Sequence, residues 1–173
     1  MFKSERQGHG FIYENNVIER FGLTKATGYT EDFDAYLGED AYQIKTIKLG
    51  SSIDMGDYFR NMNKSRDFYL IIGFWNGEKT NIVEEHVLYI KADKFREILA
   101  FEKAEEMKEW IKGVSNDHLY DGQWKKEVEY WKKEYGKRII PLRFKRDHKN
   151  QKRIQCAINK KDFYDYFLKE FKV

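Results

Sequence analysis

The residue types that could do chemistry together lie near the start of the chain. Asp34, Gln43 and Lys45 offer a carboxylate, an amide oxygen and an ammonium, on two short runs at residues 33–37 and 42–47. Both runs alternate apolar and polar side chains, and this period of two predicts half-buried strands. The glycine-led connection between them predicts a tight turn, so the two runs form a predicted β-hairpin.

The register of that hairpin decides whether the polar groups meet. A two-residue turn with Gly38 first pairs Leu37 with Asp40, and counting back places Asp34 opposite Gln43. Directly opposed residues share a face of the sheet, and their side chains are close together. The acid, the amide oxygen and the ammonium would then converge on one patch, whereas a three-residue turn would break the alignment.

This patch resembles the active site of the PD-(D/E)xK nuclease superfamily. In that family an Asp on one strand and a Glu-x-Lys on the next bind a divalent metal beside the scissile phosphate. The matching residues here are Asp34 and Gln43-Ile44-Lys45, within roughly the first half of the chain. Gln43 stands where the pattern usually has an acid, as it does in some restriction endonucleases of the superfamily. A Gln carbonyl can ligate a hard cation, although it brings no negative charge.

The resemblance implies a role for each of these residues. Asp34 would anchor Mg²⁺, with Mn²⁺ able to substitute, and Gln43 and the backbone carbonyl of Ile44 would complete the protein's share of the ligands. The metal would lower the pKa of a bound water and offset charge on the phosphate. Lys45 would position that water or stabilise the transition state as a compact point charge.

A helix is predicted just before the hairpin, and it carries a further acid. Residues 11–21 have helical spacing of apolar residues, and Gly22 is a natural C-terminal stop. In the superfamily a helix before the catalytic strands often offers an acid to the metal, so the resemblance implies Glu14 as an auxiliary ligand. The alternative is a solvated glutamate favoured by the helix dipole, and both interpretations stay open. The candidate core positions of this helix are Phe11, Val17, Ile18 and Phe21.

The segment after Lys45 has a composition that suits phosphate contact. Lys48, Ser51 and Ser52 flank Gly50, which gives a loop the freedom to approach a backbone closely. Asp54 is a candidate cap for a following helix. Further positive charge comes from Arg60 and Lys64. Simple solvation explains these residues equally well, so phosphate binding is one of two open interpretations.

The strongest charge cluster is the segment 137–153. It carries a net charge of +7 in a chain whose total is +3, so the remaining residues are net acidic. Its apolar flanks predict two strands joined at a tip at residues 147–151. A two-stranded ribbon can enter a major groove, although charge runs usually face water. The candidate DNA contacts here are Arg143, Lys145, Arg146, His148, Lys149, Asn150, Gln151, Lys152 and Arg153.

The other elements predict a mixed sheet flanked by helices, of the α/β or α+β kind. Continuous or alternating apolar runs predict two further strands, and apolar residues at helical spacing predict the remaining helices. We therefore expect one domain over 1–173, with a catalytic core at 1–91 and a helical region carrying the basic β-hairpin at 92–173; the resemblance implies a restriction-endonuclease-like fold. The predicted strands are 68–75 and 81–90, and the predicted helices are 92–112 with a break near Phe101, 117–135 and 159–171.

Composition and missing motifs narrow the function classes. Cys156 is the only cysteine, which excludes an internal disulfide framework and favours a reducing, cytoplasmic location. No apolar run has transmembrane length, and the N-terminus has no signal-peptide apolar region, so no membrane partner is expected. The histidines and the cysteine have no zinc-ligand spacing, and no glycine-rich nucleotide loop is present. The sequence therefore predicts neither a zinc site nor a nucleotide cofactor.

These observations lead to one expected function and two rivals. We expect a Mg²⁺-dependent, sequence-specific endonuclease of the type II restriction kind that cuts double-stranded DNA. One site per chain and a duplex substrate suggest a homodimer on a palindromic target. The first rival is a homing, repair or junction-resolving nuclease on the same fold. The second is a non-catalytic nucleic-acid-binding protein, in which Gln43 marks lost activity.

Overall fold

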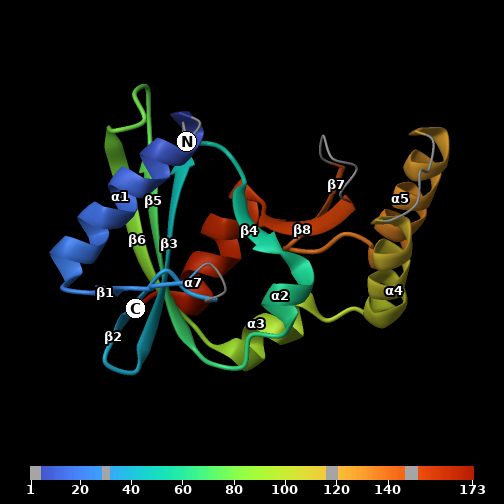
Figure 1. Cartoon of the computed structure of the whole chain (residues 1–173), viewed down its shortest axis with the longest axis horizontal. Helices are drawn as coiled ribbons and strands as arrows, with labels where there is room; N and C mark the ends of the chain where they lie inside the picture. The colour runs from blue at the N-terminus through green and yellow to red at the C-terminus, as the bar shows by residue number, and fades with distance from the viewer. Residues whose placement is uncertain (1–4, 29–31, 116–120, 147–151) are drawn as a thin grey trace. The chain divides into compact units, whose positions relative to one another are not determined.

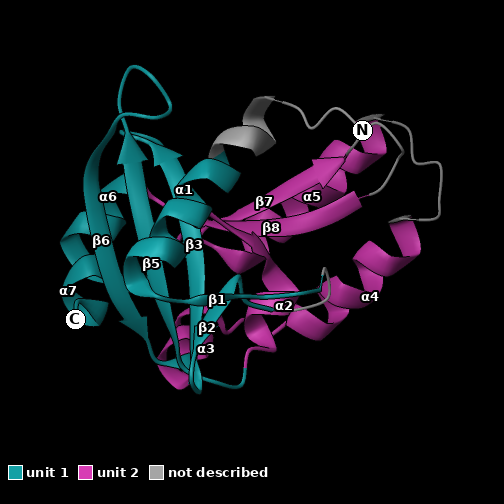
Figure 2. Cartoon of the chain, turned by 60° about the vertical axis from the view of Figure 1, so that its left-hand side comes forward, with its two compact units in different colours: residues 1–52, 65–92, 160–173 teal, residues 53–64, 93–159 magenta. Residues whose placement is uncertain are grey.

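The computed structural model describes residues 5–28, 32–115, 121–146 and 152–173, which form α-helices and two β-sheets (Figure 1). The chain divides into two compact units that interleave in sequence (Figure 2). These units are discontinuous in sequence, unlike the two consecutive regions, 1–91 and 92–173, into which we divided the expected single domain. The first unit comprises 1–52, 65–92 and 160–173, and the second comprises 53–64 and 93–159.

The first unit is built on a five-stranded mixed sheet with strand order β1-β2-β3-β5-β6. Strand β3 runs parallel to β5, and every other neighbouring pair is antiparallel. The continuous apolar run FYLIIGFW forms the central strand β5, as predicted. The bounds are β1 Thr24–Lys25, β2 Ala35–Leu37, β3 Asp40–Lys48, β5 Phe68–Trp75 and β6 Ile82–Ile90.

Helix α1 (Glu5–Phe21) ends where the sequence predicts, although it begins earlier than expected. Gly22 has φ 64°, a left-handed conformation that glycine adopts without a Cβ penalty. The Leu23 N–H donates to the Ile18 carbonyl at 2.9 Å, which satisfies one of the helix's last free carbonyl groups.

The buried face of α1 differs from the predicted one. Tyr13 and Val17 are buried with Ile44 and its neighbours on the sheet. The apolar spacing predicts Phe11 and Phe21 in the core, but they are 42% and 37% exposed. The positions i and i+4 share one side of a helix, and here that side begins at a tyrosine, which a purely apolar pattern passes over.

A C-terminal helical segment covers the other face of the sheet in the first unit. Phe163 lies against Phe74 with ring centroids 5.7 Å apart, in an edge-to-face arrangement. The predicted mixed sheet flanked by helices is therefore confirmed, and the last predicted helix contains a π-helical stretch. Its pieces are α6 Lys160–Asp162, η1 Phe163–Phe167 and α7 Leu168–Phe171.

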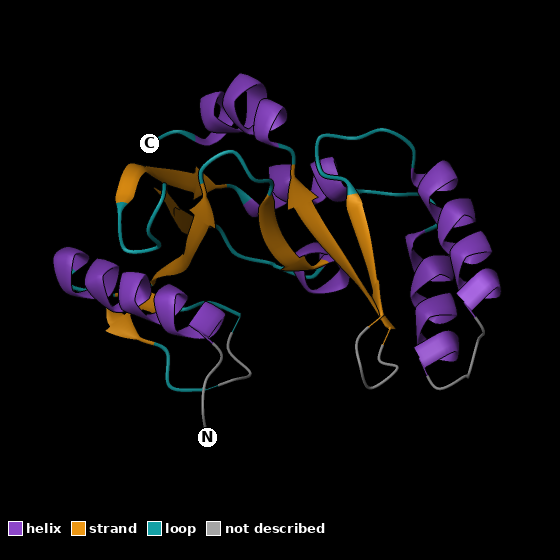
Figure 3. Ribbon diagram, turned by 90° about the horizontal axis from the view of Figure 1, so that it is seen from above, coloured by secondary structure: helices purple, strands orange, loops and turns teal. Residues whose placement is uncertain are grey.

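The second unit holds a three-stranded antiparallel sheet with order β4-β8-β7. The predicted basic hairpin is confirmed as β7–β8, and its tip lies outside the described residues. Helices α4 and α5 run side by side (Figures 1 and 3), and Trp110 stacks on Trp124 between them at 5.6 Å. The bounds are β4 Ile53–Asp57, α2 Tyr58–Met62, α3 Ala92–Leu99, α4 Ala104–Ser115, α5 Asp121–Tyr135, β7 Leu142–Arg146 and β8 Lys152–Ile158.

Strand β4 is an element that the sequence does not predict. Asp54, the candidate helix cap, lies in the strand and accepts a hydrogen bond from the Gly56 N–H at 2.8 Å. The ladder with β8 is irregular at this point, and Gly56 has φ 83°. The helix cap is Asp57, whose carboxylate accepts from the Arg60 N–H at 2.8 Å. The bulge hides the strand because it interrupts the alternation of side chains.

None of the helices in the described ranges combines the length and the apolar composition needed to cross a bilayer.

Candidate functional site

The β2–β3 hairpin has the two-residue register that the sequence predicts. Leu37 pairs with Asp40 and Ala35 pairs with Tyr42. Gly38 has φ 60°, as the first position of a tight hairpin turn requires. The spacing of the polar residues along the two arms is therefore the spacing on which the expected site depends.

Asp34 lies one residue before β2, and its carboxylate reaches the neighbouring strand. The Asp34 N–H donates to the Tyr42 carbonyl at 2.9 Å. Its Oδ2 accepts a hydrogen bond from the Ile44 N–H at 2.7 Å. Strand β2 begins only at Ala35, so the side chain takes the place of a strand partner for Ile44. Within the described residues, Asp34 Oδ1 makes no hydrogen bond.

Gln43 and Lys45 point to the same face of β3, and Ile44 points to the other. Alternation along the strand sets this arrangement. Ile44 is only 8% exposed and belongs to the cluster under α1. Gln43 and Lys45 are half-buried, beside Leu70 and Ile72 of β5. Among the residues described, Lys45 forms neither an ion pair nor a hydrogen bond, which leaves its ammonium available to a ligand.

At this edge of β3 the Asp34 carboxylate lies against the main chain of Ile44. The N–H and C=O of one strand residue point to the same side, so the Ile44 carbonyl faces the edge that Asp34 occupies. A carboxylate, a backbone carbonyl and an amide oxygen are ligands that Mg²⁺ accepts. The described residues contain no cluster of three His, Cys, Asp or Glu side chains that could hold a metal. Asp34 is the one acid that the expected set has on the hairpin, and the other expected acid is Glu14 on α1.

Glu14 is engaged elsewhere. It lies on α1, which covers the face opposite to Gln43 and Lys45, and its Oε1 is 3.3 Å from the Lys25 Nζ. The structure does not gather Glu14 with the hairpin residues. Glu14 also lies in the middle of α1, away from the N-terminal turn that the helix-dipole alternative requires, and it is paired with Lys25.

The predicted phosphate contacts after β3 come together at one cavity of the first unit. Lys48 and Ser51 are exposed and Ser52 is half-buried. All three line a cavity of about 460 Å³. The cavity lies at the C-terminal ends of the parallel strands β3 and β5, which contribute part of its lining. Its other lining residues are Gly10, Thr46, Ile47, Trp75 and Lys79.

The two cations predicted after this loop belong to the second unit and differ in exposure. Arg60 is exposed on α2. Lys64 is buried, with only 4% exposed, which differs from the surface contact that we expected.

Three of the basic hairpin residues share one face of the β7–β8 ladder. Lys145 pairs with Arg153, and Arg143 pairs with Gln155 two positions along, so the three cations alternate to the same side. Arg143 and Arg153 are exposed, while the Lys145 Nζ lies 4.0 Å from Asp54. We call Arg143, Lys145 and Arg153 the basic face.

The remaining predicted hairpin residues are placed differently. Lys152 is 6% exposed, and its Nζ donates to the Val114 carbonyl at 2.6 Å, in the last turn of α4. It therefore satisfies a helix end instead of facing a phosphate. Arg146 is exposed at the end of β7. His148, Lys149, Asn150 and Gln151 lie outside the described residues.

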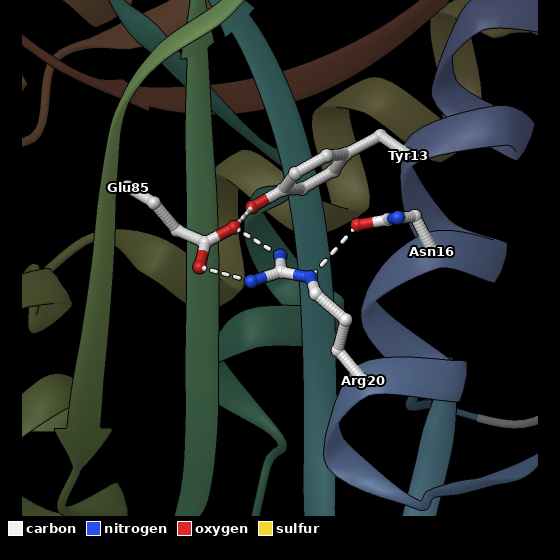
Figure 4. Close-up of polar contacts among 4 residues, drawn as sticks. All are labelled: Tyr13, Asn16, Arg20 and Glu85. Carbon is white, nitrogen blue, oxygen red and sulfur yellow. Dashed lines mark hydrogen bonds and ion pairs between the residues drawn. The ribbon is translucent and has the colours of Figure 1, made fainter.

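A polar network that the sequence does not reveal connects α1 to β6 (Figure 4). The Tyr13 hydroxyl donates to Glu85 Oε2 at 2.6 Å. Arg20 binds both oxygens of Glu85, at 2.5 and 3.1 Å, and its Nε donates to Asn16 at 2.8 Å. Burial raises the pKa of Glu85, but the hydrogen bonds from Arg20 and Tyr13 and the charge of Arg20 outweigh it. The pKa therefore lies below its ordinary value.

The one sequence signal of this network is a glycine in an apolar strand. A Cβ on Gly73 would lie 2.5 Å from the Tyr13 ring, so only glycine leaves room for that side chain. We interpret this network as structural, because both oxygens of the Glu85 carboxylate accept hydrogen bonds from Tyr13 and Arg20.

Comparisons with known proteins identify no relative of this chain. No family model, curated protein or solved structure matches it.

Proposed function

We propose that this protein is a Mg²⁺-dependent endonuclease that hydrolyses phosphodiester bonds of double-stranded DNA at the β2–β3 hairpin. The observation that carries the proposal is the 2.7 Å hydrogen bond from the Ile44 N–H to the Asp34 carboxylate. It places the acid against the main chain of the residue between Gln43 and Lys45. The two-residue register supports it, because the resemblance to the PD-(D/E)xK superfamily depends on that register.

The residues at this edge divide the work of binding and hydrolysis. Asp34 would hold Mg²⁺ through Oδ1, with the Gln43 amide oxygen and the Ile44 carbonyl as further ligands. Bound Mg²⁺ lowers the pKa of a coordinated water and offsets charge on the phosphate. Lys45 would hold that water, or the phosphate oxygens, through its ammonium. Mn²⁺ would substitute for Mg²⁺, since the same oxygen ligands suit both ions.

The substrate is assigned from charge and from the resemblance. The basic face offers three cations at the spacing of a two-stranded ribbon, which suits the phosphate backbone of DNA. A restriction-type enzyme with one site per chain would act as a homodimer, because cutting both strands at a symmetric site needs two copies. We place it in the cytoplasm, where a single reduced cysteine is stable.

Two other functions fit parts of the same geometry. A homing, repair or junction-resolving nuclease would use the same chemistry on a different substrate. A non-catalytic nucleic-acid-binding protein is favoured by one observation. Among the described residues, Asp34 is the one expected acid at the hairpin, and it already accepts a backbone hydrogen bond. In that case Asp34 would serve only to hold the hairpin.

Cleavage of DNA separates these functions. Mixed-sequence duplex DNA, cruciform DNA and long genomic DNA are incubated with the protein and Mg²⁺ or Mn²⁺, using wild type, Asp34→Ala and Lys45→Ala. Discrete duplex fragments that both variants fail to produce, while still binding DNA, support the restriction-type proposal. Cleavage of cruciform DNA alone would favour a junction-resolving nuclease. Binding without cleavage of any substrate would favour the non-catalytic protein.

A further inference from the structure

The cavity at the C-terminal ends of β3 and β5 is lined by side chains suited to an anion that carries an aromatic ring. Two of its lining residues, Lys48 and Lys79, are cations, and none is acidic. Trp75 supplies an aromatic surface, and the Lys48 Nζ lies 5.8 Å from its ring centroid. Ser51 and Ser52 add hydroxyl groups. Cationic, hydroxyl and aromatic groups together are what a phosphorylated aromatic molecule requires.

The two lysines that line this cavity have no acidic partner among the side chains that the structure describes. Neither Lys48 nor Lys79 has an ion pair with an acidic side chain in the described part of the chain. A third ammonium is close, since the Lys160 Nζ lies 3.8 Å from the position that a Cβ on Gly50 would take. Like charges gathered without a counter-charge repel one another, so an anion would relieve an electrostatic cost.

A second observation at the cavity is independent of charge. Thr46 lines the cavity, and its Oγ1 is buried without a hydrogen-bond partner among the described residues. Buried hydroxyl groups normally have a partner, and one left without it costs free energy.

The walls of the cavity are held by the backbone of the first unit. Lys48 and Trp75 are neighbours in the parallel β3–β5 ladder. The Leu49 N–H donates to the Trp75 carbonyl at 2.8 Å, and the Ser51 N–H donates to the Lys48 carbonyl at 3.0 Å. These bonds fix the backbone of the loop that carries the serines against the end of β5, beside Trp75.

We propose that this cavity binds one nucleotide unit, with its phosphate on Lys48 and Lys79 and its base against Trp75. A volume of about 460 Å³ lies within the ordinary range of small-molecule sites. Carboxyl ends of parallel strands are where open sheets commonly bind ligands. The unit is either a free nucleoside monophosphate or one nucleotide of a nucleic-acid strand.

This site is separate from the proposed cleavage site. Lys48 and Trp75 lie on the α1 side of the sheet, by alternation from Ile44, and Gln43 and Lys45 lie on the other side. Binding here needs neither the metal nor Asp34. The inference therefore stands or falls independently of nuclease activity.

The test is an equilibrium binding titration without divalent metal. The probes are adenosine 5′-monophosphate, inorganic phosphate, adenosine and a 5′-phosphorylated single-stranded oligodeoxynucleotide. The variants are Lys48→Ala/Lys79→Ala and Trp75→Leu. The matched control is Lys125→Ala/Lys132→Ala, which removes the same charge from exposed positions on α5. Circular dichroism shows whether each variant remains folded.

Wild type is expected to bind the monophosphate at least about tenfold more tightly than phosphate or adenosine alone. The lysine pair should weaken monophosphate binding at least about tenfold relative to the control pair. Trp75→Leu should weaken monophosphate binding but leave phosphate binding unchanged, with Trp75→Phe restoring part of the loss. Tighter binding of the oligodeoxynucleotide than of the monophosphate identifies a strand as the source, and equal binding identifies the free nucleotide. No binding by wild type, or equal effects of the lysine and control pairs, would overturn the proposal.

Discussion

The two carboxylate oxygens of Asp34 allow it to stabilise the hairpin and to bind a metal, because each role needs a different oxygen. Oδ2 satisfies the Ile44 N–H, which strand β2 does not reach. Oδ1 makes no hydrogen bond to the described residues. If Asp34 only stabilised the hairpin, it would need one oxygen atom to accept the Ile44 N–H, and its negative charge would not be needed. Substitutions that keep the acceptor and remove the charge therefore separate the two roles.

The structural role of Asp34 predicts a specific order of stabilities. Asp34→Ala leaves the Ile44 N–H without its acceptor, so the free energy of unfolding should fall by about 1 to 3 kcal/mol. Asp34→Asn keeps an amide oxygen for that N–H and should lose less than about 1 kcal/mol. Urea unfolding followed by circular dichroism measures both. Equal losses in the two variants would show that the hydrogen bond does not stabilise the hairpin.

At the scale of elements, a close contact between Tyr13 of α1 and Gly73 of β5 helps to hold the helix on the sheet. The ring of Tyr13 fills the space where Gly73 has no side chain, and its hydroxyl meets Glu85 on β6. Sequence patterns predict the helix and the strand but not this contact. The residues are far apart in the chain, and a glycine within an apolar strand does not indicate which ring it faces.

Gly73→Ala should destabilise the first unit by about 1 to 3 kcal/mol, because the new methyl group would displace the Tyr13 ring. The double-mutant cycle with Tyr13→Ala tests the cause, since the alanine at 73 should cost much less once the ring is absent. Thermal or urea unfolding of the four proteins provides the values. Additive effects of the two substitutions would mean that the ring and the glycine do not interact.

The Arg20–Glu85 pair predicts how stability depends on pH. The pKa of Glu85 is lowered in the folded protein relative to its ordinary value of 4.5. Its contribution is therefore complete above pH 4.5 and is lost as the pH falls through the folded pKa. Glu85→Gln should lower the free energy of unfolding by about 1 to 2 kcal/mol at about pH 7, and by less in acid. Urea unfolding of both proteins across roughly pH 3 to 7 measures this difference. A constant loss over that range would contradict the assignment.

At the scale of the whole molecule, the positive charge is concentrated in segment 137–153 of the sequence. In the structure, the cations of this segment lie on both faces of the β7–β8 ladder. Alternation in β7–β8 sends Arg143, Lys145 and Arg153 to one side, and Lys152 into the structure. The composition predicts the cluster but not this sorting, because the face depends on which side of the ladder α4 covers. The burial of Lys64 could not be predicted from composition either, because it too depends on which elements pack around the residue.

The basic face predicts a salt-dependent weakening of DNA binding when its charges are removed. Replacing Arg143, Lys145 and Arg153 together by Ala should weaken duplex binding and lower the slope of log affinity against log salt by about 1 for each phosphate that is no longer neutralised. Fluorescence anisotropy at several salt concentrations measures both. Lys125→Ala/Lys132→Ala is the control for net charge. An equal change in slope per charge removed in the control would show that the basic face does not bind DNA phosphates specifically.

Most of the strands and helices could be predicted from the sequence, because each is long enough to show its own periodicity. The exceptions are β1, which has two residues, and β4, whose alternation is broken at Gly56. The hairpin register follows from a two-residue turn, but the sequence alone left a three-residue turn open, and the structure decides between them. The cavity was predictable only in part, since Lys48 and Trp75 are brought together by a parallel ladder whose register no local pattern encodes.

The most direct test of the proposed nuclease compares wild type with Asp34→Asn on mixed-sequence duplex DNA in Mg²⁺. This variant keeps a hydrogen-bond acceptor for Ile44, so it should fold and bind DNA as the wild type does. We predict discrete fragments from wild type, and a rate at least about a hundredfold lower for the variant, because the metal loses its only carboxylate ligand. Equal cleavage by both proteins would contradict metal binding by Asp34 and the site proposed at this hairpin.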